Sequence, residues 1–416
     1  MLAAITARSA FVGIFSTLLL LGCGQPAERT EPGAGPESWA AGEVETQVAE
    51  ILARQDRIAR TGGLANLLQD LPPRFLDEVL AGFDGAFLEW GDNEPVLLAE
   101  WWTRFDPLAA KRWSESDWRA DHPRVALTVM RAMARTDPQM ALQTYFDEYS
   151  GLRPEASQYP GGLEAIVIGW YESGQDGLLD FIKGQPIPEL RQQTMGTLAR
   201  LVVLDLGGQG AIEWTEARIA EDGSEIFARQ IQQRIAAAIA EDDPALASAW
   251  VERLIAQGAH GSLPRRVATR WAKQNPEAAL LWLESFEDNA HRHQAIAESW
   301  NVFWRKDPQR AHAWVREQGD KTYGFLGPAL ARSIKQQVTL EKKAGLPTDY
   351  EAYLAESIRI EDPEVRWGSV TFVARFWRLE DEAAAEAWMV EHDVPENFRF
   401  KVRGPLPGGL RNLGES

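Results

Sequence analysis

The chain has 416 residues and carries 43 basic against 61 acidic side chains, which gives a formal charge of −18 at pH 7. A chain this acidic is not expected to bind nucleic acid or anionic lipid through charge alone. The only cysteine is Cys23, so no disulfide can form within the chain, which is long enough to build a core without one.

The first 22 residues have the pattern of a signal peptide. One basic residue, Arg8, precedes an apolar run at 10–21 that is too short to span a bilayer comfortably. A leucine at Leu20 and a small residue at Gly22 then lead into Cys23, a sequence that resembles the lipobox of bacterial lipoproteins. The resemblance implies cleavage before Cys23, a diacylglyceryl thioether on its sulfur and an acylated amino terminus. The alternative is an ordinary signal peptide followed by a chance cysteine.

The same resemblance implies a location in the cell. Several acyl chains on one residue hold a protein on a membrane where a single chain would not. The next residue is Gly24 and not the aspartate that retains many such lipoproteins at the inner membrane, so we expect an outer-membrane anchor facing the periplasm of a Gram-negative cell. Residues 23–43 are rich in Pro, Gly, Ala and Glu, which predicts that a flexible tether follows the lipidated Cys23.

Helical periodicity begins near Val44, and amphipathic helices are expected at 64–83 and 96–105. Strand signals are scarce throughout the chain. We therefore expect one all-α domain of helical repeats over 44–402, followed by a frayed tail at 403–416 that is rich in glycine and proline.

An Asp/Asn-Pro-x-x-Ala-x-x-Trp phrase dominates the C-terminal half. Its prolines Pro244, Pro276 and Pro308 are 32 residues apart. Asp or Asn caps a helix, proline suits its first position, and the residue before proline leaves helical geometry. Each dipeptide therefore predicts the end of one helix and the start of the next. A fixed period of this size predicts stacked helical hairpins.

The phrase can be followed outward with increasing divergence. It matches fully at Pro107 and more weakly near 138, 175, 208 and 382, and the gap after Pro308 leaves room for one divergent unit near 346–358. The tryptophan six residues after the anchor is predicted to fill the space between neighbouring helical layers. These structural tryptophans are Trp113, Trp214, Trp250, Trp282, Trp314 and Trp388.

In repeat length and helix pairing, residues 102–388 resemble a tetratricopeptide-like α-solenoid. The usual Trp-x-x-Leu-Gly-x-x-Tyr phrase is absent, so the resemblance extends to the superfamily shape, an α-α superhelix of TPR-like or HEAT-like hairpins. It implies a concave surface that binds peptides or partner proteins. Outer-membrane lipoproteins with similar repeats assist outer-membrane protein assembly or regulate cell-wall synthases.

Few residues suggest catalytic or metal chemistry. His291 and His293 would point to opposite sides of a helix, and no third ligand is spaced to complete a zinc site. Paired carboxylates such as Glu241-Asp242 fall at helix starts, where the positive end of the helix macrodipole stabilises acidic side chains. The glycines at 207–210 indicate a turn. With no nucleophile elbow, P-loop or dinucleotide fingerprint, we expect no catalytic residue, no cofactor and no metal.

One basic stripe is a candidate binding surface. Arg266, Arg270 and Lys273 are spaced to share one helix face beside Trp271. They could contact an acidic peptide or a cell-wall carboxylate, or they could form a solvated face paired with neighbouring Asp and Glu.

The sequence thus favours a membrane-anchored periplasmic lipoprotein whose helical repeats bind a protein or peptide, with no nucleic acid and no catalysis. The alternative is a cell-wall (peptidoglycan) hydrolase built on a helical superhelix, which needs two carboxyl groups converging in a cleft. A third hypothesis is an apolar ligand carried in a groove lined by Ala and Trp.

Overall fold

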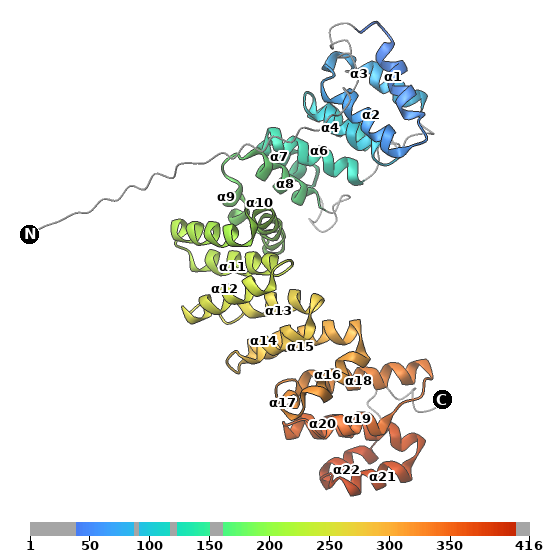
Figure 1. Cartoon of the computed structure of the whole chain (residues 1–416), viewed down its shortest axis with the longest axis vertical. Coiled ribbons are helices and arrows are strands. Elements are labelled where there is room, and N and C mark those ends of the chain that lie inside the picture. Colours follow the sequence, from blue (N-terminus) through green and yellow to red (C-terminus); the bar gives the residue numbers. More distant parts are fainter. Residues whose placement is uncertain (1–38, 87–90, 117–122, 150–160, 405–416) are drawn as a thin grey trace, which may run out of the picture. The chain divides into compact units, whose positions relative to one another are not determined.

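A computed structural model describes residues 39–86, 91–116, 123–149 and 161–404 (Figure 1). Throughout these ranges every regular element is a helix and no strand occurs, so the all-α prediction is confirmed. The predicted signal peptide, Cys23 and most of the predicted tether and tail lie outside the described residues.

The chain divides into two compact units, residues 1–105 (unit 1) and 106–416 (unit 2). The boundary falls at Asp106-Pro107, the first full copy of the repeat phrase. The described helices of unit 1 are α1 (Glu43–Leu52), α2 (Arg57–Gln69), the 3-10 helix η1 (Pro73–Phe75), α3 (Leu76–Gly85) and α4 (Glu94–Thr103).

In unit 1, α1 packs against α3 and α2 packs against α4. The expectation of one helix over 64–83 is wrong, because α2 ends at Gln69 and α3 begins at Leu76. Pro72 and Pro73 separate them, since a proline lacks the N–H that helix continuation needs and clashes with the preceding turn. The expected helix at 96–105 corresponds to α4.

Unit 2 is built mainly of pairs of consecutive helices. In each pair the earlier helix in the chain is here called the first helix and the later one the second helix. Its helices are α5 (Pro107–Ser116), α6 (Pro123–Thr136), α7 (Pro138–Tyr149), α8 (Gly162–Ser173), α9 (Leu178–Gly184), α10 (Pro188–Asp222), α11 (Glu225–Ile239), α12 (Pro244–Ala256), α13 (Leu263–Gln274), α14 (Pro276–Glu284), α15 (Ala290–Lys306), α16 (Pro308–Gln318), α17 (Asp320–Phe325), α18 (Gly327–Ala344), α19 (Tyr350–Ser357), α20 (Pro363–Glu380), α21 (Glu382–Glu391) and α22 (Glu396–Arg403).

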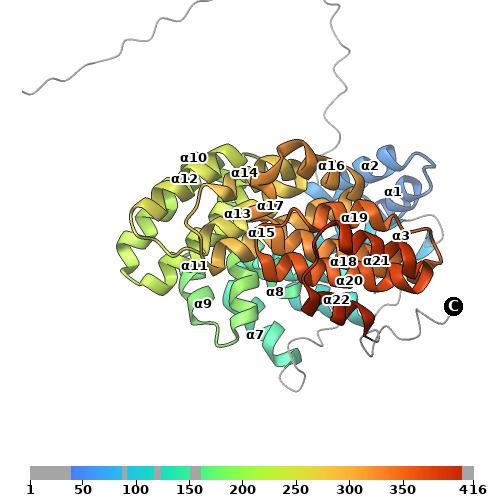
Figure 2. The same cartoon turned by 90° about the horizontal axis from the view of Figure 1, so that it is seen from below.

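The first helices of successive pairs contact one another in chain order, from α11 to α13, α15, α18 and α20. The second helices α12, α14 and α16 each pack on a neighbouring first helix. Figure 2 shows α12, α14 and α16 along one side of unit 2, with α11, α13 and α15 beside them. Unit 2 therefore has a row of first helices and a row of second helices from α11 onward.

The Asp/Asn-Pro junctions behave as the sequence predicts. The carboxylate of Asp307 accepts a hydrogen bond from the backbone N–H of Arg310 at 2.9 Å, which caps α16. The backbone N–H of Asp307 donates to the carbonyl of Phe303 at 3.0 Å, which closes the last turn of α15. Asn275 makes the equivalent pair of bonds between α13 and α14. One residue thus terminates a helix and starts the next.

The divergent unit predicted between Pro308 and Glu382 is present. It consists of α18 and α19, preceded by the short α17. Asp349 caps α19 by accepting from the N–H of Ala352 at 3.0 Å. Tyr350, the first residue of α19, stands 32 residues before Glu382, so the repeat period resumes there.

The glycine-rich segment at 207–210 forms the predicted break. Helical geometry continues over all of α10 except at Gly207, whose φ of 69° lies in the left-handed region that glycine tolerates. A Cβ on the next residue, Gly208, would come within 2.7 Å of Leu246 on α12. The segment therefore serves both as a turn and as a close packing contact.

The repeat tryptophans differ in burial. Trp250, Trp314 and Trp388 are buried, whereas Trp113, Trp214 and Trp282 are half-buried. Trp282 keeps one edge at the surface, where its indole N–H donates to Glu252 at 2.7 Å. The predicted packing role thus holds fully at three of the six positions.

Candidate functional site

Two first helices of unit 2, α13 and α18, are strongly cationic. The first helix α13 carries four basic side chains and no acidic one, and α18 carries four basic side chains against one carboxylate. The second helix α21 carries three glutamates and no basic residue. In a chain of net charge −18, α13 and α18 are therefore unusual in carrying an excess of cations.

The predicted basic stripe lies on α13 and is only partly neutralised. Arg270 forms an ion pair with Glu241 at 3.2 Å. Arg266 is half-buried, and Lys273 is exposed and makes no ion pair with a carboxylate in the described part of the chain. All three residues lie on α13. On a solvated face we would expect each to pair with an Asp or Glu side chain, but only Arg270 does so among the described residues.

The structure adds Arg234, on the preceding first helix α11, to this cluster. Burial, followed by repulsion from Arg266 and Arg270, lowers the pKa of the Arg234 guanidinium. Its hydrogen-bond partner is neutral, the amide oxygen of Gln192 at 3.0 Å. The sequence did contain the signal, because Arg234 and Arg266 each stand ten residues before a repeat proline, Pro244 and Pro276.

A second feature of the first-helix row is a cavity of about 860 Å³ between α15, α18 and α20, here called the α18 groove. Its apolar lining is formed by Trp304, Ala331, Leu340, Val365 and Phe372.

Its cationic lining is formed by Arg305, Arg332 and Lys335, against one carboxylate, Glu364. None of these three cations forms an ion pair with a carboxylate among the residues that the structure describes. Lys335 is half-buried, its Nζ lies 5.9 Å from the centre of the Phe372 ring, and burial lowers its pKa. The groove thus combines an apolar surface with uncompensated positive charge.

Sequence reasoning missed the α18 groove. Apart from Trp304 and Arg305, its residues lie in the stretch between Pro308 and Glu382 where the repeat phrase is absent, so no anchor marked them. A smaller cavity of about 370 Å³ adjoins it and shares Trp304, Arg305 and Arg332. This cavity reaches Glu298 on α15. Glu298 accepts a hydrogen bond at 3.3 Å from Arg265 on α13, the residue just before Arg266 of the basic stripe.

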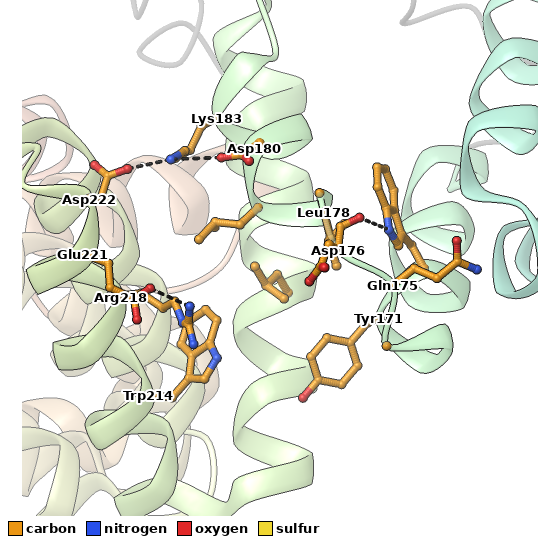
Figure 3. Close-up of a pocket in the computed structure, with 15 residues that line it drawn as sticks. Tyr171, Gln175, Asp176, Leu178, Asp180, Lys183, Trp214, Arg218, Glu221 and Asp222 are labelled. Atoms are coloured by element: carbon orange, nitrogen blue, oxygen red, sulfur yellow. Dashed lines mark hydrogen bonds and ion pairs between the residues drawn. The ribbon is translucent and has the colours of Figure 1, made fainter.

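A polar cavity of about 520 Å³ lies between α8, α9 and α10 (Figure 3). Both of its cations are paired: Lys183 contacts Asp222 at 2.5 Å and Asp180 at 3.3 Å, and Arg218 contacts Glu221 at 2.6 Å. Asp176 also lines the cavity, so its carboxylates outnumber its cations and it offers no unpaired cation to an anionic ligand.

The same cavity bears on the hydrolase alternative. A glycosidase general acid needs a carboxyl whose pKa is raised. The pKa of Asp222 is instead lowered, chiefly by its hydrogen bond from Lys183. On the opposite wall, burial and the hydrogen bond to Asp205 raise the pKa of Tyr171 to about 12, which keeps its phenol protonated. Neither group is poised to protonate a leaving oxygen.

A polar trio, of which His312 and Glu356 are buried and Arg316 is exposed, joins α16 to α19. Glu356 accepts from the Nδ1 of His312 at 2.6 Å and from Arg316 at 2.5 Å, and both His312 and Glu356 are buried. The ring of His312 lies 6.3 Å from the ring of Trp300 and 6.3 Å from that of Tyr353. The geometry of the trio fits a structural link between two helical pairs.

The two histidines of the His-x-His pair do not converge. His293 contacts Asp288 at 2.6 Å, whereas the ring of His291 lies 5.0 Å from that of His260. Among the residues that the structure describes, no group of three His, Cys, Asp or Glu side chains is arranged to hold a metal ion. Within the described ranges, no helix has both the length and the apolar character needed to cross a membrane.

The chain matches no protein-family model, no curated protein and no solved structure.

Proposed function

We propose that unit 2 is an α-solenoid whose first helices line the inner, concave side. In support, each first helix from α11 to α20 contacts the next first helix, whereas the second helices pack mainly on first helices. A row that packs continuously is shorter than a row that does not, and the stack bends toward it. Solenoids of this kind commonly bind extended partners on their inner surface.

We further propose that the chain is an exported lipoprotein, anchored by acyl chains on Cys23 to the periplasmic face of the outer membrane. The lipobox-like sequence before Cys23 supports this proposal. Growth with an alkyne-tagged palmitate should label the wild-type chain in the membrane fraction. Cys23→Ser should abolish both the label and the membrane association, and a labelled Cys23→Ser chain would contradict the proposal.

Within that setting, the proposed function is the binding of a protein or peptide partner in the cell envelope. The observation that carries this proposal is the cluster of cations on the first helices α13 and α18 of a strongly acidic chain, among them Arg332 and Lys335, which form no ion pair with a carboxylate among the described residues. Cations that repel one another cost stability unless an anionic partner offsets the repulsion. A catalytic role gains no such support from the carboxyl groups of the polar cavity.

A photocrosslinking amino acid placed on each helix row tests this function in cells. Gln336 lies exposed on the first helix α18, and Glu391 lies exposed on the second helix α21. We expect one reproducible crosslinked protein from position 336 and none from 391. Equal crosslinking from both positions, or none from either, would contradict a partner-binding first-helix row.

A further inference from the structure

We propose that the α18 groove binds a linear acidic segment of a partner protein, with a bulky apolar side chain against Trp304 and Phe372 and flanking carboxylates on Arg332 and Lys335. The inference rests on the proposed function and narrows it to one groove and one class of ligand.

The apolar part of the groove is open to such a side chain. Leu340 is 53% exposed and Phe372 is half-buried, and both line the groove beside buried Trp304. Apolar surface of this kind gains free energy when it is removed from water, in rough proportion to its area. A bulky aliphatic or aromatic side chain would cover it.

The charged part of the groove selects the sign of the partner. Arg332 and Lys335 are three residues apart on α18 and therefore share one face of the helix. Arg332 is exposed, whereas Lys335 is half-buried against the Phe372 ring and has lost part of its hydration. A carboxylate would restore favourable interactions to both, and a basic segment would be repelled.

The form of the groove favours a chain over a small apolar molecule. Small apolar ligands are usually enclosed, whereas this groove is open to solvent along its length. The Gln336 side chain lies on its wall and offers hydrogen bonds to a peptide backbone, whereas the Thr339 hydroxyl already donates to the carbonyl of Lys335 at 2.7 Å. A free fatty acid would satisfy the apolar and charged parts but would leave the Gln336 amide unused.

Selection from a displayed library of random peptides about 12 residues long, against the full chain purified in detergent, tests the ligand class. We expect enriched peptides to combine Asp or Glu with Leu, Phe or Trp. One enriched peptide is then synthesised with a fluorescent label, and its affinity is measured by anisotropy against the wild type and four variants.

The variants come in matched pairs. Arg332→Gln combined with Lys335→Gln should weaken binding at least about tenfold, because both charged contacts are lost. Lys343→Gln, on an exposed residue of the same helix about 12 Å beyond Lys335, should change affinity by less than about twofold. Leu340→Ser should weaken binding about fivefold, while Leu346→Ser, at a comparable exposure of 55%, should not.

The outcomes separate this inference from the proposed function. Enriched peptides that are basic, or that bind the Arg332/Lys335 and Leu340 variants as well as the wild type, would overturn the groove and leave a peptide-binding solenoid standing. Selection of no peptide, together with no crosslink from position 336, would overturn both. A fatty acid that co-purifies with the chain and blocks the acidic peptide would also overturn the inference, in favour of a lipid carrier.

Discussion

Trp314 and Trp282 hold the same place in consecutive repeats but lie in different surroundings. Trp314 is 1% exposed, and its ring lies 6.0 Å from that of Phe303. Trp282 is half-buried and contacts Trp271 and Phe286 from the edge of the same core. At the scale of single residues, burial and not the repeat position decides how much each indole contributes to stability.

We expect Trp314→Ala to lower the free energy of unfolding by about 3–5 kcal/mol, since it leaves a large cavity. Trp282→Ala should cost about 1–3 kcal/mol, because part of its ring is already in contact with water. Urea unfolding followed by circular dichroism measures both. Equal losses in the two variants would show that the repeat position outweighs burial.

Glu94 in unit 1 provides a residue-scale prediction about pH. It is 1% exposed and accepts hydrogen bonds from Arg60 and from the N–H of Gly91, both at 2.8 Å. Burial alone would raise the pKa of Glu94, but these hydrogen bonds outweigh it and hold the pKa below its ordinary value of 4.5. Because the folded-state pKa is depressed, the stabilisation is present above about pH 4.5 and is lost as the pH falls through the folded-state value.

Glu94→Gln should therefore destabilise the chain by about 3 kcal/mol at pH 7, since it leaves Arg60 buried without a charged partner. The difference from wild type should shrink as the pH falls below about 4.5. Urea unfolding at pH 7 and pH 4 gives both values. The exposed Glu50→Gln serves as the control and should change stability by less than about 0.5 kcal/mol. A difference that does not depend on pH would contradict the assignment.

At the scale of elements, helix pairs depend on close approach as well as on apolar faces. The first helices α6 and α8 pack together over most of their length. Gly169 on α8 faces the backbone carbonyl of Arg131 on α6, and an added Cβ would overlap that oxygen. The missing side chain is therefore a requirement of this crossing and not of the helix itself.

Gly169→Ala should destabilise unit 2 by about 3 kcal/mol, because the two backbones must separate to admit the methyl group. Gly196→Ala, within α10, meets only Arg234 at 4.0 Å and should stabilise by about 0.5–1 kcal/mol through helix propensity. Thermal unfolding distinguishes the two. A neutral Gly169→Ala would mean that the α6–α8 contact is looser than the structure shows.

At the scale of the whole molecule, the helices of unit 2 contact mainly their neighbours in the chain. Stability in such an arrangement is a sum of local terms and nearest-neighbour interfaces. Damage to one layer should therefore stay local.

We expect Trp314→Ala to accelerate amide hydrogen exchange in α15, α16 and α18 and to leave α6 and α8 at wild-type rates. Mass spectrometry of peptic peptides from the full chain measures this directly. Uniform acceleration across 106–404 would show that unit 2 unfolds as one cooperative body, which would count against the proposed solenoid.

The sequence alone determined the helical class, the helix junctions and the period. It could do so because each depends on neighbouring residues: a capping Asp or Asn, a proline that lacks an N–H, and an aromatic at a fixed distance. The same locality explains why the divergent pair α18–α19 was expected before its helices were known. The break at Pro72 and Pro73 is an equally local signal, but the expectation of a single helix over 64–83 did not take it into account.

Only the tertiary structure decided which repeat tryptophans are buried and that Trp304, Lys335 and Phe372 meet in one groove. These facts depend on how separate helices approach one another, and that approach is set by side chains far apart in the chain. A carboxylate's partner likewise cannot be read from its own neighbours. Glu94 finds Arg60 across 34 residues, and Arg332 and Lys335 find no carboxylate among the described residues.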